Sequence, residues 1–189
     1  MDSGLRMHAE RTPNPDSVKW VLSVPVVQTG ERAQFSEQPA AGVSPLAQAL
    51  FSVPGVSEVY LGSDFVTVSK RPELEWGDLA EAIVGGIKEW AQSGALALGP
   101  AYEAPRSEAG GEAGGEIVQR IVEILERDIR PYVAQDGGEI RFAGYRDGVV
   151  EVYLQGACSG CPSSSITLKM GIEARLKEEI PEVKEVVAL

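Results

Sequence analysis

The sequence predicts an α+β protein of two small domains joined by a flexible linker. Apolar residues recur with the period of strands and with the period of amphipathic helices in both halves of the chain. Between about Gly99 and Gly115, Gly, Ala, Glu, Pro and Ser replace almost every residue that could be buried. The predicted division is a domain over residues 11–94, an acidic linker over 95–115 and a second domain over 116–189.

Two prolines, and an alternation of apolar and polar residues after them, predict how the first domain begins. Two prolines keep residues 12–16 extended, and residues 17–27 then alternate apolar and polar side chains, which predicts a half-buried strand. A short strand is expected over residues 33–35. Ser44 and the proline after it predict a helix over residues 45–51, because a capping hydroxyl there precedes a residue suited to the first helical position.

A hairpin and a longer helix complete the first domain. Residues 56–61 and 65–70 are predicted to be two strands around a Gly-Ser-Asp turn. Residues 76–93 follow as an amphipathic helix, because apolar residues recur at spacings of four, four and three. These apolar residues are Leu79, Ile83, Ile87 and Trp90.

The second domain is predicted in the order helix, strand, strand, helix, strand. Residues 116–129 have a broad apolar face typical of a helix, which Pro131 kinks or ends. Asp136-Gly-Gly then turns the chain. Two strands follow over residues 139–145 and 149–154, joined by Asp-Gly, a dipeptide that tolerates the positive φ of a tight hairpin turn. The last elements are a helix over residues 162–179 and, after a breaking proline, a strand over 183–189.

Charge and composition exclude several classes of function. The formal net charge of -11 argues against a protein that binds nucleic acid by neutralising phosphates, and acidic proteins of this kind usually meet proteins or small ligands. No run approaches the roughly 18 apolar residues of a membrane span. Residues 1–15 resemble neither a secretory signal nor a transit peptide, so we expect a cytoplasmic protein. Two cysteines so close together cannot form a disulfide framework, which favours a reducing compartment.

The only two cysteines, Cys158 and Cys161, lie in one glycine-flanked turn. A thiolate pair at this spacing can exchange disulfides, share a metal ion, or supply two of the four thiolates that an iron-sulfur cluster usually needs. Gly156 and Gly160 let the backbone bend tightly around the sulfurs. A helix that begins at Pro162 adds a partial positive charge, which suits a ligand and a redox nucleophile equally.

The number of available ligands limits the ways in which the two cysteines can bind a metal ion or a cluster. His8 is the only histidine, lies far from the cysteines in sequence and is expected to be an exposed tail residue. A site with four thiolates therefore needs two chains, each contributing Cys158 and Cys161. The same count allows a zinc ion shared by a dimer. A cluster held between two subunits is exposed and can be surrendered when the dimer parts, as a carrier requires.

The residues around the cysteines resemble a known family. Gly156-Ala-Cys-Ser-Gly-Cys-Pro-Ser-Ser and Thr167-Leu-Lys-Met-Gly-Ile-Glu, with Ile129-Arg-Pro, Asp136-Gly-Gly and Pro181-Glu-Val, resemble the Nfu domain, also known as the NifU C-terminal domain. The first half is similar to the Nfu N-terminal domain. That similarity runs from Arg11-Thr-Pro-Asn-Pro through Val53-Pro-Gly-Val and Asp64-Phe-Val-Thr-Val to the helix that contains Trp90.

The resemblance implies an iron-sulfur cluster scaffold or carrier and not an enzyme. It implies that Cys158 and Cys161 bind a [4Fe-4S] cluster across a homodimer, with a [2Fe-2S] form left open, and that the cluster comes from donor proteins and passes to apo-protein clients. No catalytic residue is expected. The N-terminal domain is implied to be an accessory domain that engages partners and holds no cluster, in agreement with the absence of cysteine before residue 158.

Three other interpretations stay open beside this one. A thiol-disulfide oxidoreductase would use the same pair at a helix N-terminus, although the pair follows a hairpin and not a βαβ unit. A shared structural zinc and a pair of inert thiols are the others, and an exposed loop between glycines is unsuited to the last. A turn between helix and strand explains Asp136-Gly-Gly fully.

Overall fold

The computed structural model describes residues 4–28, 31–40, 42–104, 115–159 and 162–189. The chain divides into two compact units, Met1–Ala104 and Pro105–Leu189, each with its own sheet and its own buried core. The predicted two-domain α+β architecture is therefore confirmed. Residues 105–114 of the predicted linker lie outside the described residues.

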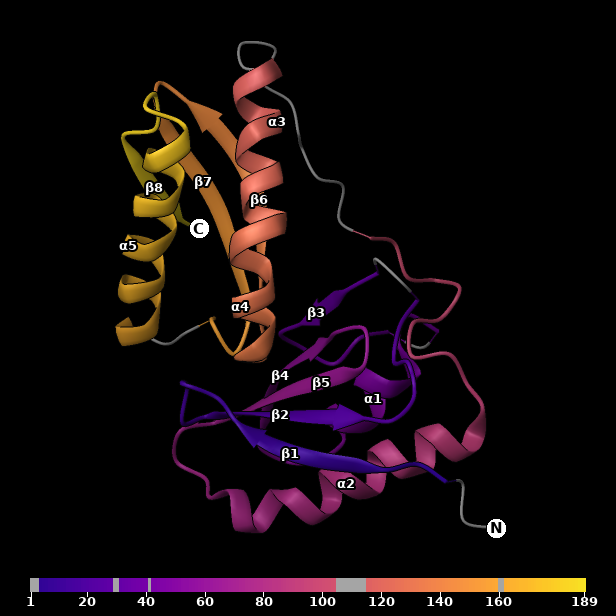
Figure 1. The fold of residues 1–189 in the computed structure, drawn as a ribbon. Coiled ribbons are helices and arrows are strands. Elements are labelled where there is room, and N and C mark those ends of the chain that lie inside the picture. Colours follow the sequence, from indigo (N-terminus) through magenta and orange to yellow (C-terminus); the bar gives the residue numbers. More distant parts are fainter. Residues whose placement is uncertain (1–3, 29–30, 41, 105–114, 160–161) are drawn as a thin grey trace. The chain divides into compact units, whose positions relative to one another are not determined.

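The N-terminal unit is an antiparallel sheet in the order β1-β2-β5-β4-β3, packed against two helices (Figure 1). The strands are β1 (Met7–Arg11), β2 (Ser17–Leu22), β3 (Ala33–Phe35), β4 (Val56–Leu61) and β5 (Phe65–Lys70). The helices are α1 (Pro45–Phe51) and α2 (Trp76–Ser93). Their bounds agree with the predicted ones except in β2, which ends at Leu22.

Local signals explain why these elements form where they do. The hydroxyl of Ser44 accepts a hydrogen bond from the amide of Ala47 at 3.1 Å, which is the expected helix cap. The four apolar positions of the α2 stripe are all buried and face the sheet core. Alternation in β2 likewise buries Trp20 and Leu22 in that core.

Two parts of the N-terminal unit differ from the prediction. Strand β1 was not predicted, because its side chains show no apolar alternation and its place depends on pairing with β2. Residues 95–104 were assigned to the linker, yet they lie against this unit: Ala97 is buried in its core, and its carbonyl accepts from the Ser44 hydroxyl at 2.6 Å. The Tyr102 hydroxyl donates to the carbonyl of Arg32 at 2.9 Å.

The C-terminal unit has a three-stranded sheet in the order β6-β7-β8, with helical segments over its core (Figure 1). Its helical segments are α3 (Gly115–Ile124), the π-helix η1 (Leu125–Ile129), α4 (Arg130–Gln135) and α5 (Pro162–Glu179). Its strands are β6 (Gly138–Arg146), β7 (Val149–Gly156) and β8 (Glu185–Ala188), with β6 and β7 antiparallel and β7 and β8 parallel. Asp147 and Gly148 have φ values of 53° and 90°, as the predicted hairpin turn requires.

The first helical segment continues past Pro131 and contains one wide π-helical turn just before it. The chain passes from α3 through η1 into α4, with Pro131 in the first turn of α4. Proline lacks an amide proton and its ring clashes with the carbonyl four residues earlier, so one wide turn before it relieves the helix. This insertion places η1 and α4 alongside α5 (Figure 1).

Candidate functional site

Cys158 lies in the turn that follows β7 and is packed into the core of the C-terminal unit. Its exposed fraction is 7%, so the side chain is buried and not exposed as the sequence suggested. Gly156 ends the strand with a φ of 64°, a left-handed conformation that favours glycine. The amide and the hydroxyl of Ser159 both donate to the Gly156 carbonyl, at 3.0 and 2.8 Å, and close the turn.

Gly138 gives the Cys158 sulfur its space. A Cβ at this position would lie 2.4 Å from Cys158 Sγ and 3.1 Å from the Gln155 carbonyl oxygen. The neighbouring Gly137, with a φ of 76°, accepts a hydrogen bond from the Ala157 amide at 3.1 Å. The Asp136-Gly-Gly segment therefore does more than reverse the chain between helix and strand. Its two glycines also contact the cysteine turn.

A buried ion pair holds the same segment to α4. The carboxylate of Glu139, 2% exposed, lies 2.7 Å from Arg130 Nε and also accepts from the Ile140 amide at 3.1 Å. Arg130 pairs on its outer side with Glu126. Because a buried carboxylate is costly without a partner, this pair fixes the start of β6, and with it the position of Gly138.

The other predicted site residues are placed only in part. Cys161 and Gly160 lie outside the described residues, so their proximity to Cys158 rests on the sequence. Pro162 is the first residue of α5, as predicted. His8 lies in β1 and not in a tail; its Nε2 is 3.0 Å from a carboxylate oxygen of Glu10, in the unit that contains no cysteine.

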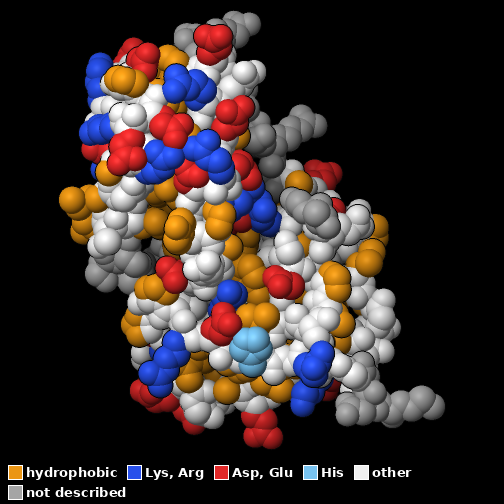
Figure 2. Space-filling model, in the orientation of Figure 1, with side chains coloured by type: hydrophobic (Ala, Val, Ile, Leu, Met, Phe, Trp, Pro, Cys, Tyr) orange, Lys and Arg blue, Asp and Glu red, His pale blue; other side chains and the backbone are white. Residues whose placement is uncertain are grey.

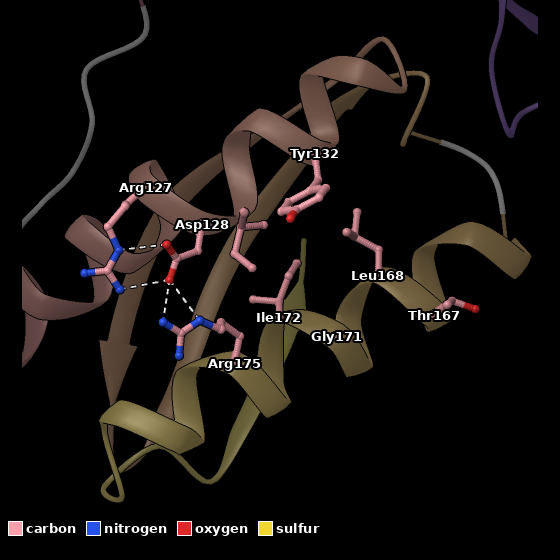
Figure 3. Close-up of a pocket in the computed structure, with 9 residues that line it drawn as sticks. Arg127, Asp128, Tyr132, Thr167, Leu168, Gly171, Ile172 and Arg175 are labelled. Carbon is pink, nitrogen blue, oxygen red and sulfur yellow. Dashed lines mark hydrogen bonds and ion pairs between the residues drawn. The ribbon is translucent and has the colours of Figure 1, made fainter.

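An open groove of about 620 Å³ runs between the η1–α4 segment and α5 (Figure 3). Its walls come from opposite sides: Tyr132 points in from α4, while Leu168 and Ile172 point in from α5. Ile129, which is half-buried, also lines the groove. Sequence reasoning missed this groove, because its two sides are far apart in the chain and meet only in the folded unit.

Ion pairs close the groove at the end away from Tyr132 (Figure 3). Asp128 lies 2.7 Å from Arg127 and 2.6 Å from Arg175, and both arginines also pair with Glu179. The Arg127 guanidinium, with help from Arg175, lowers the pKa of Asp128 to about 2. Arg175 likewise lowers the pKa of Glu179. This network ties η1 to α5.

The described residues were compared with the requirements of a metal site and of a membrane span. Within them, no three His, Cys, Asp or Glu side chains gather in a way that could hold a metal ion. Nor does any helix in the described ranges have the length and apolar character needed to cross a membrane. The candidate site is the cysteine turn. In it the Cys158 thiol packs against Gly138, and the turn lies between the end of β7 and the start of α5.

Comparison with known proteins matches both halves of the chain. The "NifU-like domain" family matches residues 121–187, and the family "Scaffold protein Nfu/NifU N terminal" matches residues 7–94. The human "NFU1 iron-sulfur cluster scaffold homolog, mitochondrial" is 42% identical over 181 residues, which cover 95% of this chain and 70% of the human protein. "NifU-like protein 4, mitochondrial" of Arabidopsis thaliana is 42% identical over 183 residues, covering 95% and 64%.

A solved structure also matches in part. The solution NMR structure of a NifU-like protein from Saccharomyces cerevisiae has a TM-score of 0.45 and 20% identity, over 50% of this chain and 84% of that one. A similarity of this extent is too weak to bear on the fold.

The fold is that of a two-domain α+β protein, and both cysteines of the sequence belong to its second domain. The family matches and the identity to the human relative are specific to one such class: the chain belongs to the Nfu family. This confirms the resemblance inferred from the sequence. The human relative and the N-terminal family are named for a scaffold and not for an enzyme, in agreement with the prediction that this chain is not an enzyme.

The predicted cytoplasmic location is wrong. The human and Arabidopsis relatives are both named mitochondrial. The composition of a folded domain does not determine the compartment in which the protein is found, because targeting segments are recognised and removed independently of the fold.

Proposed function

We propose that this chain is an iron-sulfur cluster scaffold that holds a [4Fe-4S] cluster between two copies of itself and passes it to apo-proteins. Cys158 and Cys161 are the ligands from each copy. The names of the matched relatives support the general role, and the ligand count supports the two-copy arrangement. The observation that carries the proposal is that the only two thiols of the chain are separated by two residues in the sequence, and that Gly137 and Gly138 brace the part of their turn that contains Cys158.

The cluster is cargo in this proposal, and its transfer is a ligand exchange. A client thiolate bonds to iron as a scaffold thiolate leaves and takes up a proton, without net electron transfer. Two thiolates per copy make the bound state depend on dimerisation, so separation of the copies exposes the cluster to the client. The donor proteins and clients are therefore expected to meet the cysteine end of the C-terminal unit, and the N-terminal unit to engage partners.

Anaerobic reconstitution with iron and sulfide tests the proposal. The parent chain should take up one cluster per two chains, with the visible absorbance of a [4Fe-4S] centre and the solution mass of a dimer. Cys158→Ala and Cys161→Ala should each abolish this cluster-linked dimer while far-UV circular dichroism stays unchanged. Alanine suits position 158 better than serine, since it introduces no hydroxyl at a side chain that is only 7% exposed.

Two outcomes would overturn the proposal. A cluster-linked dimer in both single variants would show that the two-plus-two ligand count is wrong. A colourless monomeric parent that reduces a disulfide substrate at a rate set by Cys158 and Cys161 would favour the oxidoreductase alternative.

A further inference from the structure

Arg130 joins α4 to the strand that the cysteine turn packs against. Its Nε lies 2.7 Å from a carboxylate oxygen of Glu139, the second residue of β6. Its Nη1 pairs with Glu126, which lies four residues earlier in the helical segment. Because the donors of a guanidinium group lie in one plane, two carboxylates on different sides of the group fix its direction as well as its position.

The pair of Arg130 and Glu139 differs from an ordinary surface ion pair. Acidic and basic side chains are intermingled on the surface of the C-terminal unit (Figure 2), and exposed pairs of this kind are weakened by water and salt. The Glu139 side chain is only 3% exposed, and its carboxylate also accepts from the Ile140 amide at 3.1 Å. A buried carboxylate that loses its cationic partner is strongly destabilised, so this pair restricts how α4 and β6 can lie relative to each other.

The start of β6 passes this restriction on to the cysteine turn. The carbonyl of Gly137 accepts a hydrogen bond from the Ala157 amide at 3.1 Å, and Gly138 pairs with Gly156 across the two antiparallel strands. A Cβ on Gly138 would lie 3.2 Å from the Cβ of Cys158 and 2.4 Å from its sulfur, so the strand and the turn are in direct contact. A small shift of β6 therefore moves the cysteine.

We propose that Arg130 is a positioning residue of the cluster site, which acts through Glu139 to hold the cysteine turn in the geometry that retains a bound cluster. This inference rests on the proposed function. Without the ion pair, β6 can shift relative to α4, and the Cys158 thiolate is no longer held where the shared cluster needs it. A ligand that is not held in advance binds less firmly, so the cluster should be lost sooner.

Arg130→Met together with Glu139→Gln, in the full-length chain, separates positioning from stability. Methionine keeps an unbranched apolar side chain at position 130, and glutamine keeps an acceptor for the Ile140 amide. Because the double variant removes the buried charge together with its cation, it should retain much of the parent's stability. Arg130→Met alone would not, since it removes the cation beside a buried carboxylate.

Amide hydrogen exchange of the apo chain measures the cysteine turn without a cluster. The Ala157 amide, which donates to Gly137, should exchange at least about tenfold faster in the double variant than in the parent, because the turn opens more easily. Val152 lies between β6 and β8 in the middle of the sheet, and its amide should exchange as in the parent.

The loaded chain provides the second measurement. After anaerobic reconstitution, cluster loss to an excess of bipyridyl should be about 10- to 100-fold faster in the double variant than in the parent, as when a residue that orients a metal ligand is removed. The resonance Raman bands of the iron–thiolate bonds should also broaden, since the ligands are held less uniformly. A loss of stability alone would leave these bands unchanged.

Leu176→Ala is the control for stability. Leu176 is fully buried in the same core, roughly 20 Å along α5 from Pro162. The variant should speed exchange at Ala157 and Val152 alike, because it destabilises the whole unit. Without denaturant the unit stays folded, so the rate of cluster loss and the Raman bands should match those of the parent.

An Ala157 amide that exchanges no faster in the double variant than in the parent would overturn the inference. That result leaves the proposed function intact, because the measurement involves no cluster. Cluster loss at the parent's rate would also overturn the inference, and so would equally fast loss from Leu176→Ala, which would assign the effect to stability. A parent chain that takes up no cluster refutes the proposed function instead, and the inference falls with it.

Discussion

The two units differ in how completely they cover their apolar side chains. Within the described ranges, the N-terminal core contains 18 buried hydrophobic residues and the C-terminal core contains 13. Among the described residues, the large hydrophobic side chains left exposed are Val24 and Leu96 in the first unit, and Tyr132, Tyr153, Ile166, Met170 and Leu189 in the second. The C-terminal unit therefore leaves more of its described large hydrophobic side chains exposed than the N-terminal unit does.

The units also differ in their chemistry. Both thiols of the chain belong to the C-terminal unit, and the single histidine of the N-terminal unit pairs with Glu10. The N-terminal unit thus offers a closed fold without cluster ligands, which is consistent with an accessory role. Substitutions that weaken one unit at a time test how far this separation extends.

The largest expected effect comes from the core of the N-terminal unit. Ile83 is fully buried there, so Ile83→Ala should lower the free energy of unfolding of this unit by about 2–5 kcal/mol. All three tryptophans lie in this unit, so their fluorescence during urea unfolding reports the change. Cluster uptake at low urea should be unaffected.

Ile172→Ala is the matched control in the C-terminal core, where Ile172 is 1% exposed. It should leave the tryptophan transition in place and lower the urea concentration at which the cluster is lost. If Ile83→Ala also released the cluster at that lower concentration, the separation between the units would be refuted.

Much of the fold could be predicted because local signals and burial agree. The Asp-Gly turn at residues 147–148, the cap at Ser44 and the stripe of α2 each depend on residues close in sequence, and each is found as predicted. Strand β1 could not be predicted, since its partner β2 stabilises it through backbone pairing that leaves no side-chain pattern. The π-helix before Pro131 is one of several ways in which a helix accommodates a proline, so the local sequence pattern does not distinguish it from a kink or a helix end.

The site was predictable to a lesser extent. The spacing of Cys158 and Cys161 predicted a turn, and the structure places Cys158 in one, while Cys161 lies outside the described residues. The contact between Gly138 and Cys158 was missed, since it joins the start of β6 to the end of β7 and a glycine's reason for lacking a side chain is visible only in three dimensions. The groove was missed for the same reason.

A smaller loss of stability is expected from a substitution at Gly138, which contacts the cysteine turn of the C-terminal unit. In Gly138→Ala the new methyl group must displace Cys158 Sγ or the Gln155 carbonyl, so the unit should lose about 1–3 kcal/mol and much of its capacity for cluster. Gly144→Ala, also in β6, is the control: its Cβ would meet only the flexible Glu151 carboxylate at 3.0 Å. Hydrogen exchange and iron content measure the two effects. Normal cluster uptake by Gly138→Ala would contradict the role given to this glycine.

The smallest expected effect is a difference in acid sensitivity between the units. Among the described carboxylates, Glu10 has a lowered pKa in the N-terminal unit, while Asp128, Glu173 and Glu179 have lowered pKa values in the C-terminal unit. A carboxylate whose pKa is lower in the folded state stabilises the fold above its unfolded pKa, and this contribution is lost as the pH falls through the folded value. For Asp128 the loss runs from about pH 4 down to about pH 2.

The C-terminal unit should therefore lose stability more steeply than the N-terminal unit as the pH is lowered from 5 to 2. Hydrogen exchange of the apo chain reports the stability of the C-terminal unit, and tryptophan fluorescence reports that of the N-terminal unit. Asp128→Asn should flatten the acid dependence of the C-terminal unit alone, and high salt should reduce the difference by screening these partly exposed pairs. Equal acid slopes in both units of the parent would mean that the Arg127–Asp128–Arg175 network does not stabilise the groove, and that packing alone joins η1 to α5.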